Sequence, residues 1–231
     1  MAAQRSVQKM IEDQVRRWEL SRRRPEVEHR RGPIITVSRL PGCYGRILAQ
    51  ELARRLKFDL FDKELLHRVA ESSHLSESIL NTIDEKNRPM ITEWVESLFR
   101  ERYLSGEYFH HLSKVLLAIA EHGRAVILGR GASWILKPQS CLRVLLVAPI
   151  EARVRIVASR EGMPREEARR RVTQEESDRR AFIRRHFHAD MLDPMHYDLV
   201  LNTGSLGHEA VLGAIQAAWE GIRMKPPAGV K

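Results

Sequence analysis

The sequence predicts an α/β fold in which helices cover both faces of a five-stranded parallel sheet. Five short apolar runs, rich in β-branched residues, are spread along the chain, and each is nearly continuous. Helical patterns separate these runs, and continuous apolar strands that alternate with helices are typical of parallel sheets buried on both faces. The first run also leads through a glycine-containing turn into a helix, which favours an α/β unit that binds phosphate.

The N-terminal segment, residues 1–32, precedes the main domain. Val7, Ile11, Val15 and Trp18 recur at helical spacing and predict an amphipathic helix over residues 5–20. The stretch SRRRPEVEHRRGP that follows is charged and contains proline, so we expect a linker. Acidic residues dilute the positive charge of the helix. We therefore expect it to pack on its own domain or to form a homodimer, rather than to lie on a membrane.

The main domain begins at residue 33 and alternates strand and helix patterns as far as residue 223. Its long helical part carries an N-cap signal at Ser76 and a break at Asn87-Arg88-Pro89. We expect strands at 34–38, 58–62, 125–129, 142–148 and 197–202, helical stretches at 63–122 and about 160–192, a C-terminal helix at 206–223 and a flexible tail at 224–231.

Composition limits the class of protein. The chain has 231 residues, of which 43% are hydrophobic, and this is enough for a packed core. No apolar run approaches the roughly 20 residues that span a bilayer, and no secretory signal is present, so we expect a cytoplasmic protein without a membrane partner. Cys43 and Cys141 have no cysteine or histidine close to them in the sequence, which argues against a disulfide framework or a zinc site.

The formal net charge of +9 is compatible with nucleic acid, an anionic membrane or phosphate-bearing small molecules as partners. Arginine alternates with glutamate through much of the chain, as it also does on solvated helix faces. We expect no nucleic-acid partner, because no known motif and no interleaving of basic and aromatic residues is present. His186 and His188 are two residues apart on a predicted helix and face different directions, so we expect no protein-held metal.

Polar residues follow the predicted strands. In open parallel sheets, ligands bind beyond the carboxyl ends of the strands. A glycine turn that leads into a helix directs backbone N–H groups at a phosphate, and the planar guanidinium of Arg130 suits a second phosphate. The residues in question are Ser38, Arg39, Gly42, Gly45 and Arg46 after the first strand, Asp62 after the second, Arg130 and Gly131 after the third, and Asn202 and Thr203 after the last.

The glycine turn departs from the strict phosphate-binding loop, which is Gly, four residues, Gly-Lys and Ser or Thr. Gly45 occupies the position of the lysine, and Arg46 occupies that of the hydroxyl that binds magnesium. The turn by itself therefore predicts phosphate binding only weakly.

Five segments in a fixed order resemble the cytidylate-kinase-like family, and together they cover roughly residues 33–220. They are ITVSRLPGCYGRILAQELARRL, FDLFDKELLHRVAE, AVILGRGASWIL, LRVLLVAPIEARVRI and YDLVLNT. The resemblance implies a three-layer P-loop kinase fold with a helical acceptor-binding insertion at about 63–122 and an Arg-rich lid at about 160–192. It also implies a nucleoside monophosphate kinase that transfers the γ-phosphate of ATP, with Mg²⁺, to a cytidylate or deoxycytidylate-like acceptor.

The resemblance further implies roles for single residues. The loop that binds ATP comprises Ser38, Arg39, Gly42, Cys43, Tyr44, Gly45 and Arg46. Arg46 is our candidate for the cation that replaces the lysine, and Asp62 for the group that orients the acceptor or a magnesium-bound water. Arg130 is similar to the arginine that holds the acceptor phosphate, and we expect Arg179 and Arg184 of the lid to close over the γ-phosphate.

Several features depart from the family pattern or have a second interpretation. Cys43-Tyr44 replaces Ser-Gly in the loop, so Tyr44 either blocks the phosphate cradle or stacks on the ligand. Gly131 replaces the aspartate that follows the Gly-Arg pair in cytidylate kinases. Asp62 also suits a helix cap, and the lid arginines suit solvated surface. The alternative function is therefore a catalytically degenerate, nucleotide-binding regulatory protein.

Overall fold

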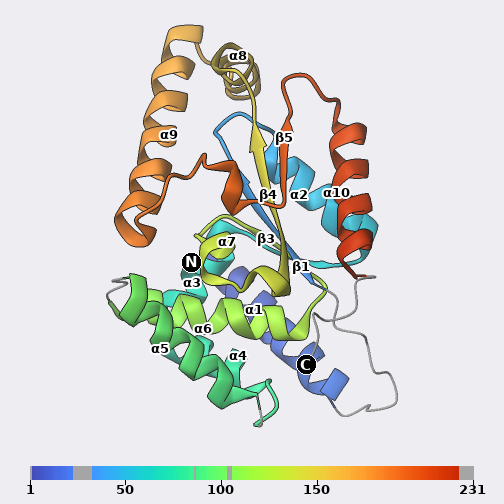
Figure 1. Ribbon diagram of the computed structural model, residues 1–231, viewed down its shortest axis with the longest axis vertical. Helices are drawn as coiled ribbons and strands as arrows, with labels where there is room; N and C mark the ends of the chain where they lie inside the picture. The colour runs from blue at the N-terminus through green and yellow to red at the C-terminus, as the bar shows by residue number, and fades with distance from the viewer. Residues whose placement is uncertain (1, 23–32, 86, 103–105, 224–231) are drawn as a thin grey trace.

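The fold is built on one parallel sheet of five strands. The computed structural model describes residues 2–22, 33–85, 87–102 and 106–223. The five predicted strands are confirmed, and each neighbouring pair is parallel. They are β1 (Ile34–Arg39), β2 (Asp59–Phe61), β3 (Ala125–Leu128), β4 (Cys141–Val147) and β5 (Leu199–Asn202), in the order β2-β3-β1-β4-β5 (Figure 1).

Strand β1 lies at the centre of the sheet, between β3 and β4. Val37 is in register with Leu128 of β3 and with Val144 of β4, and all three side chains are buried. Branched apolar side chains pack well on a pleated surface, which explains why these runs form strands. The register brings the carboxyl ends of β1 and β3 together at one edge of the sheet.

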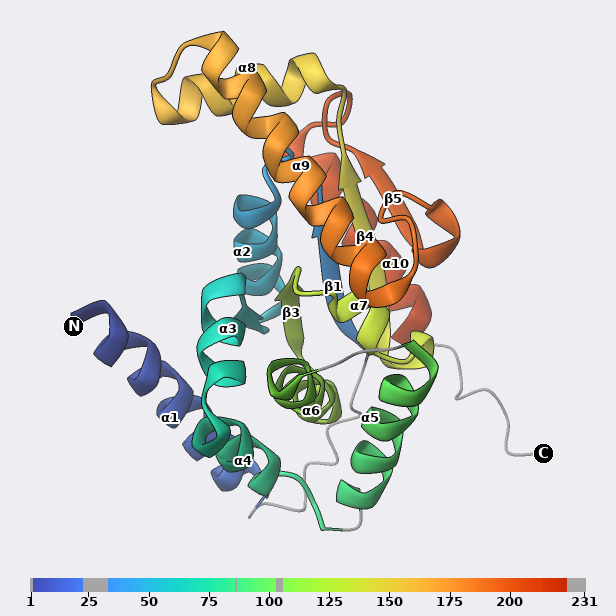
Figure 2. The same ribbon diagram turned by 90° about the vertical axis from the view of Figure 1, so that its left-hand side faces the viewer.

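Helices cover both faces of the sheet, as the continuous apolar strands predict. On one face lie α2 (Gly45–Leu56) and α10 (His208–Arg223), which bury Leu52 and Ile215 in the core. On the other face lies α7 (Ala132–Ile135), and the second half of α9 (Arg165–Phe187) packs on it through Phe187 (Figures 1 and 2). Short 3-10 helices at Pro138–Ser140 and Pro194–His196 precede β4 and β5.

A helical region between β2 and β3 occupies one end of the molecule (Figure 1). It consists of α3 (Lys63–Glu71), α4 (Ser73–Asn81), α5 (Arg88–Arg102) and α6 (Glu107–His122). The N-cap predicted at Ser76 is wrong, because Ser72 caps α4 and accepts a hydrogen bond from Leu75 N at 3.3 Å. Ser72 has the extended backbone that a cap requires, whereas Ser76 lies inside the helix and donates to Ser73 O.

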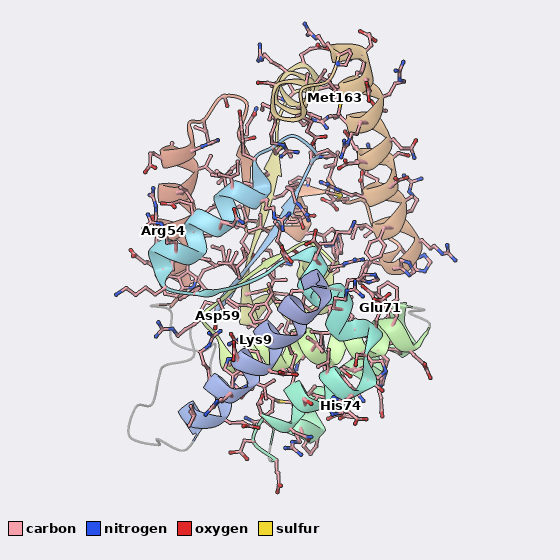
Figure 3. The ribbon with its side chains drawn as sticks, turned by 180° about the vertical axis from the view of Figure 1, so that it is seen from behind. Lys9, Arg54, Asp59, Glu71, His74 and Met163 are labelled. Atoms are coloured by element: carbon pink, nitrogen blue, oxygen red, sulfur yellow. The ribbon has the colours of Figure 1, made fainter. Side chains whose placement is uncertain are left out.

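The Arg-rich stretch forms a helical hairpin at the opposite end of the molecule, from α8 (Ile150–Glu161) and α9 (Figure 2). A small core of four side chains, Val154, Val157, Ala168 and Val172, joins the two helices and is separate from the main core. Met163 lies at the outer end of this hairpin, far from α1 (Figure 3). The hairpin therefore projects from the body of the protein and is anchored at its base.

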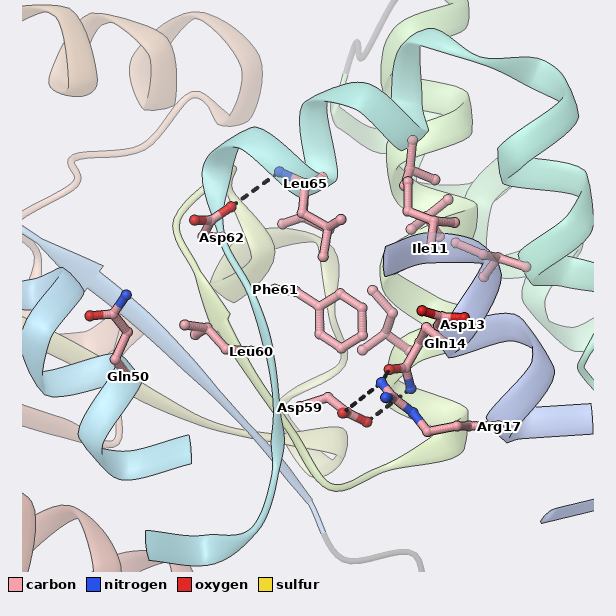
Figure 4. Close-up of a pocket in the computed structure, with 15 residues that line it drawn as sticks. Ile11, Asp13, Gln14, Arg17, Gln50, Asp59, Leu60, Phe61, Asp62 and Leu65 are labelled. Carbon is pink, nitrogen blue, oxygen red and sulfur yellow. Dashed lines mark hydrogen bonds and ion pairs between the residues drawn. The ribbon is translucent and has the colours of Figure 1, made fainter. Parts of the chain in front are cut away.

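The N-terminal helix α1 (Ala2–Arg22) packs on its own chain. Ile11 and Trp18 are buried, and the Trp18 ring stacks on His122 with 4.1 Å between ring centroids. Gln14 donates a hydrogen bond to Asp59 of β2 at 2.9 Å (Figure 4). The predicted linker at about 23–32 and the tail at 224–231 lie outside the described residues. Within the described part of the chain, no helix is both long and apolar enough to span a bilayer.

Candidate active site

A cleft of about 240 Å³ lies beyond the carboxyl ends of β1 and β3. Its walls carry four cations, Arg39 from β1, Lys63 from α3, Arg130 after β3 and Arg179 from α9, together with one carboxylate, Asp178. Charges of one sign that line a cleft raise the local concentration of ligands of the opposite sign. The cleft is therefore suited to an anion.

The loop between β1 and α2 places the start of a helix beside this cleft. Gly42 has φ +81°, and a Cβ atom there would lie 2.7 Å from the carbonyl oxygen of Arg153 in α8, so only glycine fits. Tyr44 occupies the N-cap position of α2 in the left-handed conformation and makes no capping hydrogen bond with its side chain. The first turn of α2 also contains no acidic residue. Its N–H groups and the helix dipole thus favour an anion from outside the chain.

The side chain of Arg39 crosses from this loop to the turn after β3. A Cβ atom at Gly45 would lie 2.7 Å from Cγ of Arg39, and one at Gly129 would collide with Nη1 of the same side chain. Burial, followed by the charge of Arg179, lowers the pKa of Arg39 to about 10. Among the described residues, its guanidinium forms no ion pair or hydrogen bond. Arg39 is half-buried. A partly desolvated cation without an ion-pair partner is costly, and a bound anion would relieve that cost.

Three consecutive residues after β3 have positive φ. They are Gly129 at 82°, Arg130 at 55° and Gly131 at 70°. The turn directs Arg130 towards Tyr108 of α6, with 6.0 Å from Cζ to the ring centroid, and its Nε is buried without a partner. A Cβ atom at position 131 would lie 2.7 Å from the Phe187 ring, which explains why glycine replaces the aspartate here.

Arg46 and Asp62 bind each other at one side of the loop. Their side chains form an ion pair at 2.8 Å, and Arg46 lies 3.8 Å from Glu64. Asp62 is also the N-cap of α3 and accepts hydrogen bonds from the backbone N–H groups of Glu64 and Leu65, each at 3.1 Å (Figure 4). The capping interpretation of Asp62 therefore holds, and neither residue lines the cleft.

Helix α9 closes one side of the cleft. Arg179 donates to the backbone oxygen of Arg39 at 3.0 Å and forms an ion pair with Glu175 at 2.9 Å. Burial is the first cause that lowers the pKa of Arg179. Arg184, the other arginine predicted for the lid, is exposed and does not line the cleft. The structure thus brings only one of the two predicted lid arginines to the site.

The remaining predicted residues lie around the loop. The Ser38 hydroxyl lines the cleft and is 3.3 Å from that of Ser133. Cys43 is buried under the loop, and burial raises the pKa of its thiol. The Tyr44 ring packs edge-on against His208 at 4.4 Å and does not line the cleft.

After the last strand, Asn202 and Thr203 form the turn towards α10. The Asn202 side chain accepts a hydrogen bond from Gly204 N at 2.9 Å, and the Thr203 hydroxyl donates to Val147 O at 3.3 Å. Neither side chain lines the cleft. Both side chains stabilise the turn through these hydrogen bonds.

The lining residues that sequence reasoning missed include Lys63, Phe182, Ile183 and Met191. Lys63 directly follows Asp62, so the rule that inspects strand ends could have found it. The three apolar residues come from α9 and from the segment after it. No local pattern distinguishes them from ordinary core residues, because their place in the wall depends on how α9 folds back over the sheet.

A second hollow, of about 420 Å³, lies between α1, β2 and α3 (Figure 4). Much of its wall is apolar and includes Phe61 and Leu65. Its arginine, Arg17, forms an ion pair with Asp59 at 3.2 Å. Among the described residues, Arg39 and Arg130 of the cleft form no ion pair, and Arg39 is held between two glycines. We therefore take the cleft as the candidate active site.

Residues 34–205 match the model of the cytidylate kinase-like family, and this span includes the whole cleft. The chain belongs to this family. A cytidylate kinase from Thermococcus kodakarensis is 28% identical over 196 residues, which are 85% of this chain and 92% of that protein. A cytidylate kinase from Pyrobaculum aerophilum is 30% identical over 174 residues, which are 75% of this chain and 85% of that protein.

A solved structure is also similar to this member of the cytidylate kinase-like family. It is that of an uncharacterized protein from Eubacterium ventriosum, with a TM-score of 0.57, 18% identity and coverage of 81% of this chain and 98% of the other. At this identity the likeness concerns the fold alone. The family that the five sequence segments suggest is confirmed by the matches in sequence.

Proposed function

We propose that this protein transfers the γ-phosphate of ATP to a cytidylate or deoxycytidylate-like acceptor. One observation carries the proposal: four cations from four parts of the chain line a single cleft beside the uncapped start of α2. Phosphoryl transfer needs little covalent help from a protein, because most catalysis comes from positioning two anionic substrates and stabilising charge on the transferred group. The names of the relatives, cytidylate kinases, support the same acceptor.

In this proposal Arg39, rather than Arg46, takes the place of the absent lysine. Arg46 is bound to Asp62 and is 55% exposed, so its charge is already matched. Arg39 is held between two glycines, has no anionic partner among the described residues and lines the cleft. Arg130 holds the acceptor phosphate, and Arg179 acts from α9 on the transferred group.

Magnesium accompanies ATP in this proposal and neutralises part of the phosphate charge. A nucleotide-bound Mg²⁺ typically uses the phosphates, several waters and one or two carboxylates. Among the residues that the structure describes, no three acidic, histidine or cysteine side chains gather as a metal site. Asp62 does not line the cleft, so most ligands of the metal would come from the phosphates of the substrate and from water.

The catalytically degenerate alternative is not favoured. The relatives that match over most of the chain are named cytidylate kinases. The loop without lysine still lies beside the guanidinium of Arg39, which forms no ion pair with a carboxylate of the described residues. The alternative nevertheless makes a distinct prediction, which is nucleotide binding without turnover.

The test is ADP production by the purified protein with Mg-ATP and CMP, dCMP, UMP, AMP or GMP. We expect turnover with CMP or dCMP, and a loss of about 100-fold or more in kcat/KM for Arg39→Ala and for Arg130→Ala, since single groups that stabilise a transition state contribute on this order. Arg46→Ala is the matched control, with an expected loss below about tenfold because that side chain is paired and exposed. ADP production that no acceptor stimulates, with nucleotide binding intact in calorimetry, would favour the degenerate alternative.

A further inference from the structure

Three buried polar atoms that have no hydrogen-bond partner among the described residues come from α3, α6 and the turn after β3. They are Nδ1 of His67, the hydroxyl oxygen of Tyr108 and Nε of Arg130. The rings of His67 and Tyr108 meet edge to face at 5.7 Å, and Cζ of Arg130 is 6.0 Å from the Tyr108 ring centroid. Buried polar groups in native proteins are nearly always hydrogen-bonded, so a cluster of unpaired ones indicates a missing ligand.

The cluster adjoins the cleft through Arg130, although neither His67 nor Tyr108 lines it. Lys63 lines the cleft, and His67 lies four residues further along α3, on the same face of the helix. Arg130 lines the cleft and also reaches Tyr108. A ligand whose phosphate is held by Arg130 would therefore place the rest of its structure towards His67 and Tyr108.

Glu71 determines the hydrogen-bonding character of the cluster. Its carboxylate at the end of α3 (Figure 3) is 3.1 Å from Nε2 of His67. A neutral histidine carries hydrogen on the nitrogen that faces a carboxylate, so Nδ1 is left as an acceptor. Burial raises the pKa of Tyr108, which keeps its hydroxyl protonated and able to donate. The two rings that carry this acceptor and this donor pack edge to face.

We propose that His67 and Tyr108 bind the base of the acceptor nucleotide and select cytosine over uracil. This inference rests on the proposed function. Cytosine presents an amino group beside a ring nitrogen with a lone pair, and these match Nδ1 of His67 and the hydroxyl of Tyr108. Uracil presents a carbonyl oxygen in place of the amino group, and that oxygen would face the lone pair of Nδ1. A site that forms hydrogen bonds with its substrate discriminates strongly against analogues that leave its buried polar groups unpaired.

The experiment compares kcat/KM for CMP and for UMP in the wild type and in three variants, with Mg-ATP in excess. His67→Phe keeps a ring of similar size without an acceptor. His67→Asp keeps an acceptor near the position of Nδ1 and adds no donor. His74→Phe replaces an exposed histidine on the neighbouring helix α4 and serves as the matched control. Circular dichroism spectra and thermal melts establish that each variant is folded.

We expect the wild type to prefer CMP by about tenfold to 100-fold, the range that one mismatched buried hydrogen bond produces. The preference should fall to within about threefold in His67→Phe and should survive in His67→Asp and His74→Phe. Lower activity with both acceptors at an unchanged ratio would assign His67 to structure and overturn the inference, while the proposed function stands.

If the protein phosphorylates neither acceptor, the proposed function is wrong. The affinities for CMP and UMP, measured by calorimetry, then test the base site separately. Tighter binding of CMP that His67→Phe abolishes supports the base site. Equal binding of CMP and UMP, or binding of neither, overturns it.

Discussion

Arg130 has a backbone conformation that its residue type does not favour. Its φ of 55° places it in the left-handed region between two glycines that adopt positive φ without strain. A non-glycine residue in this region costs about 1–2 kcal/mol. Glycine would fit the turn without that cost, yet an arginine stands here and lines the cleft. Its presence there agrees with the role proposed for it.

A glycine at position 130 should separate stability from activity. We expect Arg130→Gly to leave the free energy of unfolding unchanged or to raise it by up to about 1 kcal/mol, since the strain is relieved. Phosphorylation of CMP should fall about 100-fold. Chemical denaturation and an ADP-coupled assay measure the two effects.

Arg124 provides the control for this substitution. It also has positive φ, at 53°, and it is exposed at the start of β3, away from the lining of the cleft. Arg124→Gly should change the free energy of unfolding as Arg130→Gly does. Its activity with CMP should equal that of the wild type. If Arg130→Gly lost stability and kept activity, Arg130 would be a structural residue.

Among the elements, the α8–α9 hairpin combines an outer part that packs on itself with a base that packs on the sheet. Its base is held by Arg153, which is buried, forms an ion pair with Glu176 at 2.8 Å and donates to Ala148 O at 2.9 Å. The end of α9 docks on α6, where His186 lies 4.3 Å from the Phe109 ring. The docking of α9 positions Arg179 in the cleft, so this contact couples the hairpin to the site.

The docking of α9 should weaken in acid. Burial and the nearby charge of Arg185 lower the pKa of His186. A histidine whose pKa is lower in the folded state takes up its proton more readily when unfolded, so the protein loses stability as pH falls through the ordinary histidine range. We expect the wild type to lose more thermal stability between pH 7.5 and pH 5.5 than His186→Phe does. His74→Phe is the control and should behave as the wild type.

Across the whole molecule, α1 joins the edge of the sheet to the helical region. Trp18 stacks on His122 of α6 and lies 6.1 Å from the ring of Phe61 in β2. Gln14 and Arg17 both bind Asp59, at the start of β2 (Figure 4). The apolar stripe that could form a homodimer is thus occupied within one chain at Ile11 and Trp18.

The role of α1 can be tested through Trp18. We expect Trp18→Ala to lower the free energy of unfolding by about 2–4 kcal/mol, since a large buried side chain is lost at the margin of the core. The mass in solution should not change. A homodimer through the N-terminal helix stays a prediction, and a mass that halves in Trp18→Ala would support it.

Local pattern was enough to predict the sheet and the strand ends beside which the candidate site lies. Each strand is a continuous apolar run of a few residues, and the residues that follow β1 and β3 can be read from the sequence without knowing their neighbours. The segments that resemble the family then placed Arg39, Arg130 and Arg179 near phosphate. The helix cap was assigned to the wrong residue, since Ser72 and Ser76 both precede good helix formers and only the backbone conformation distinguishes them.

The sequence alone established the α/β sheet and the cytidylate kinase-like family, and it predicted a set of arginines for phosphate binding. It could not establish which arginines lack a partner. Arg46 is bound to Asp62, 16 residues away, and Arg153 to Glu176, 23 residues away, whereas Arg39 has no anionic partner among the described residues. Folding brings distant charges together, and whether a cation is neutralised or available to a ligand depends on those distances. For the same reason, the sequence could not predict the contact between His67 and Tyr108. These residues come from two helices and meet only when α3 packs on α6.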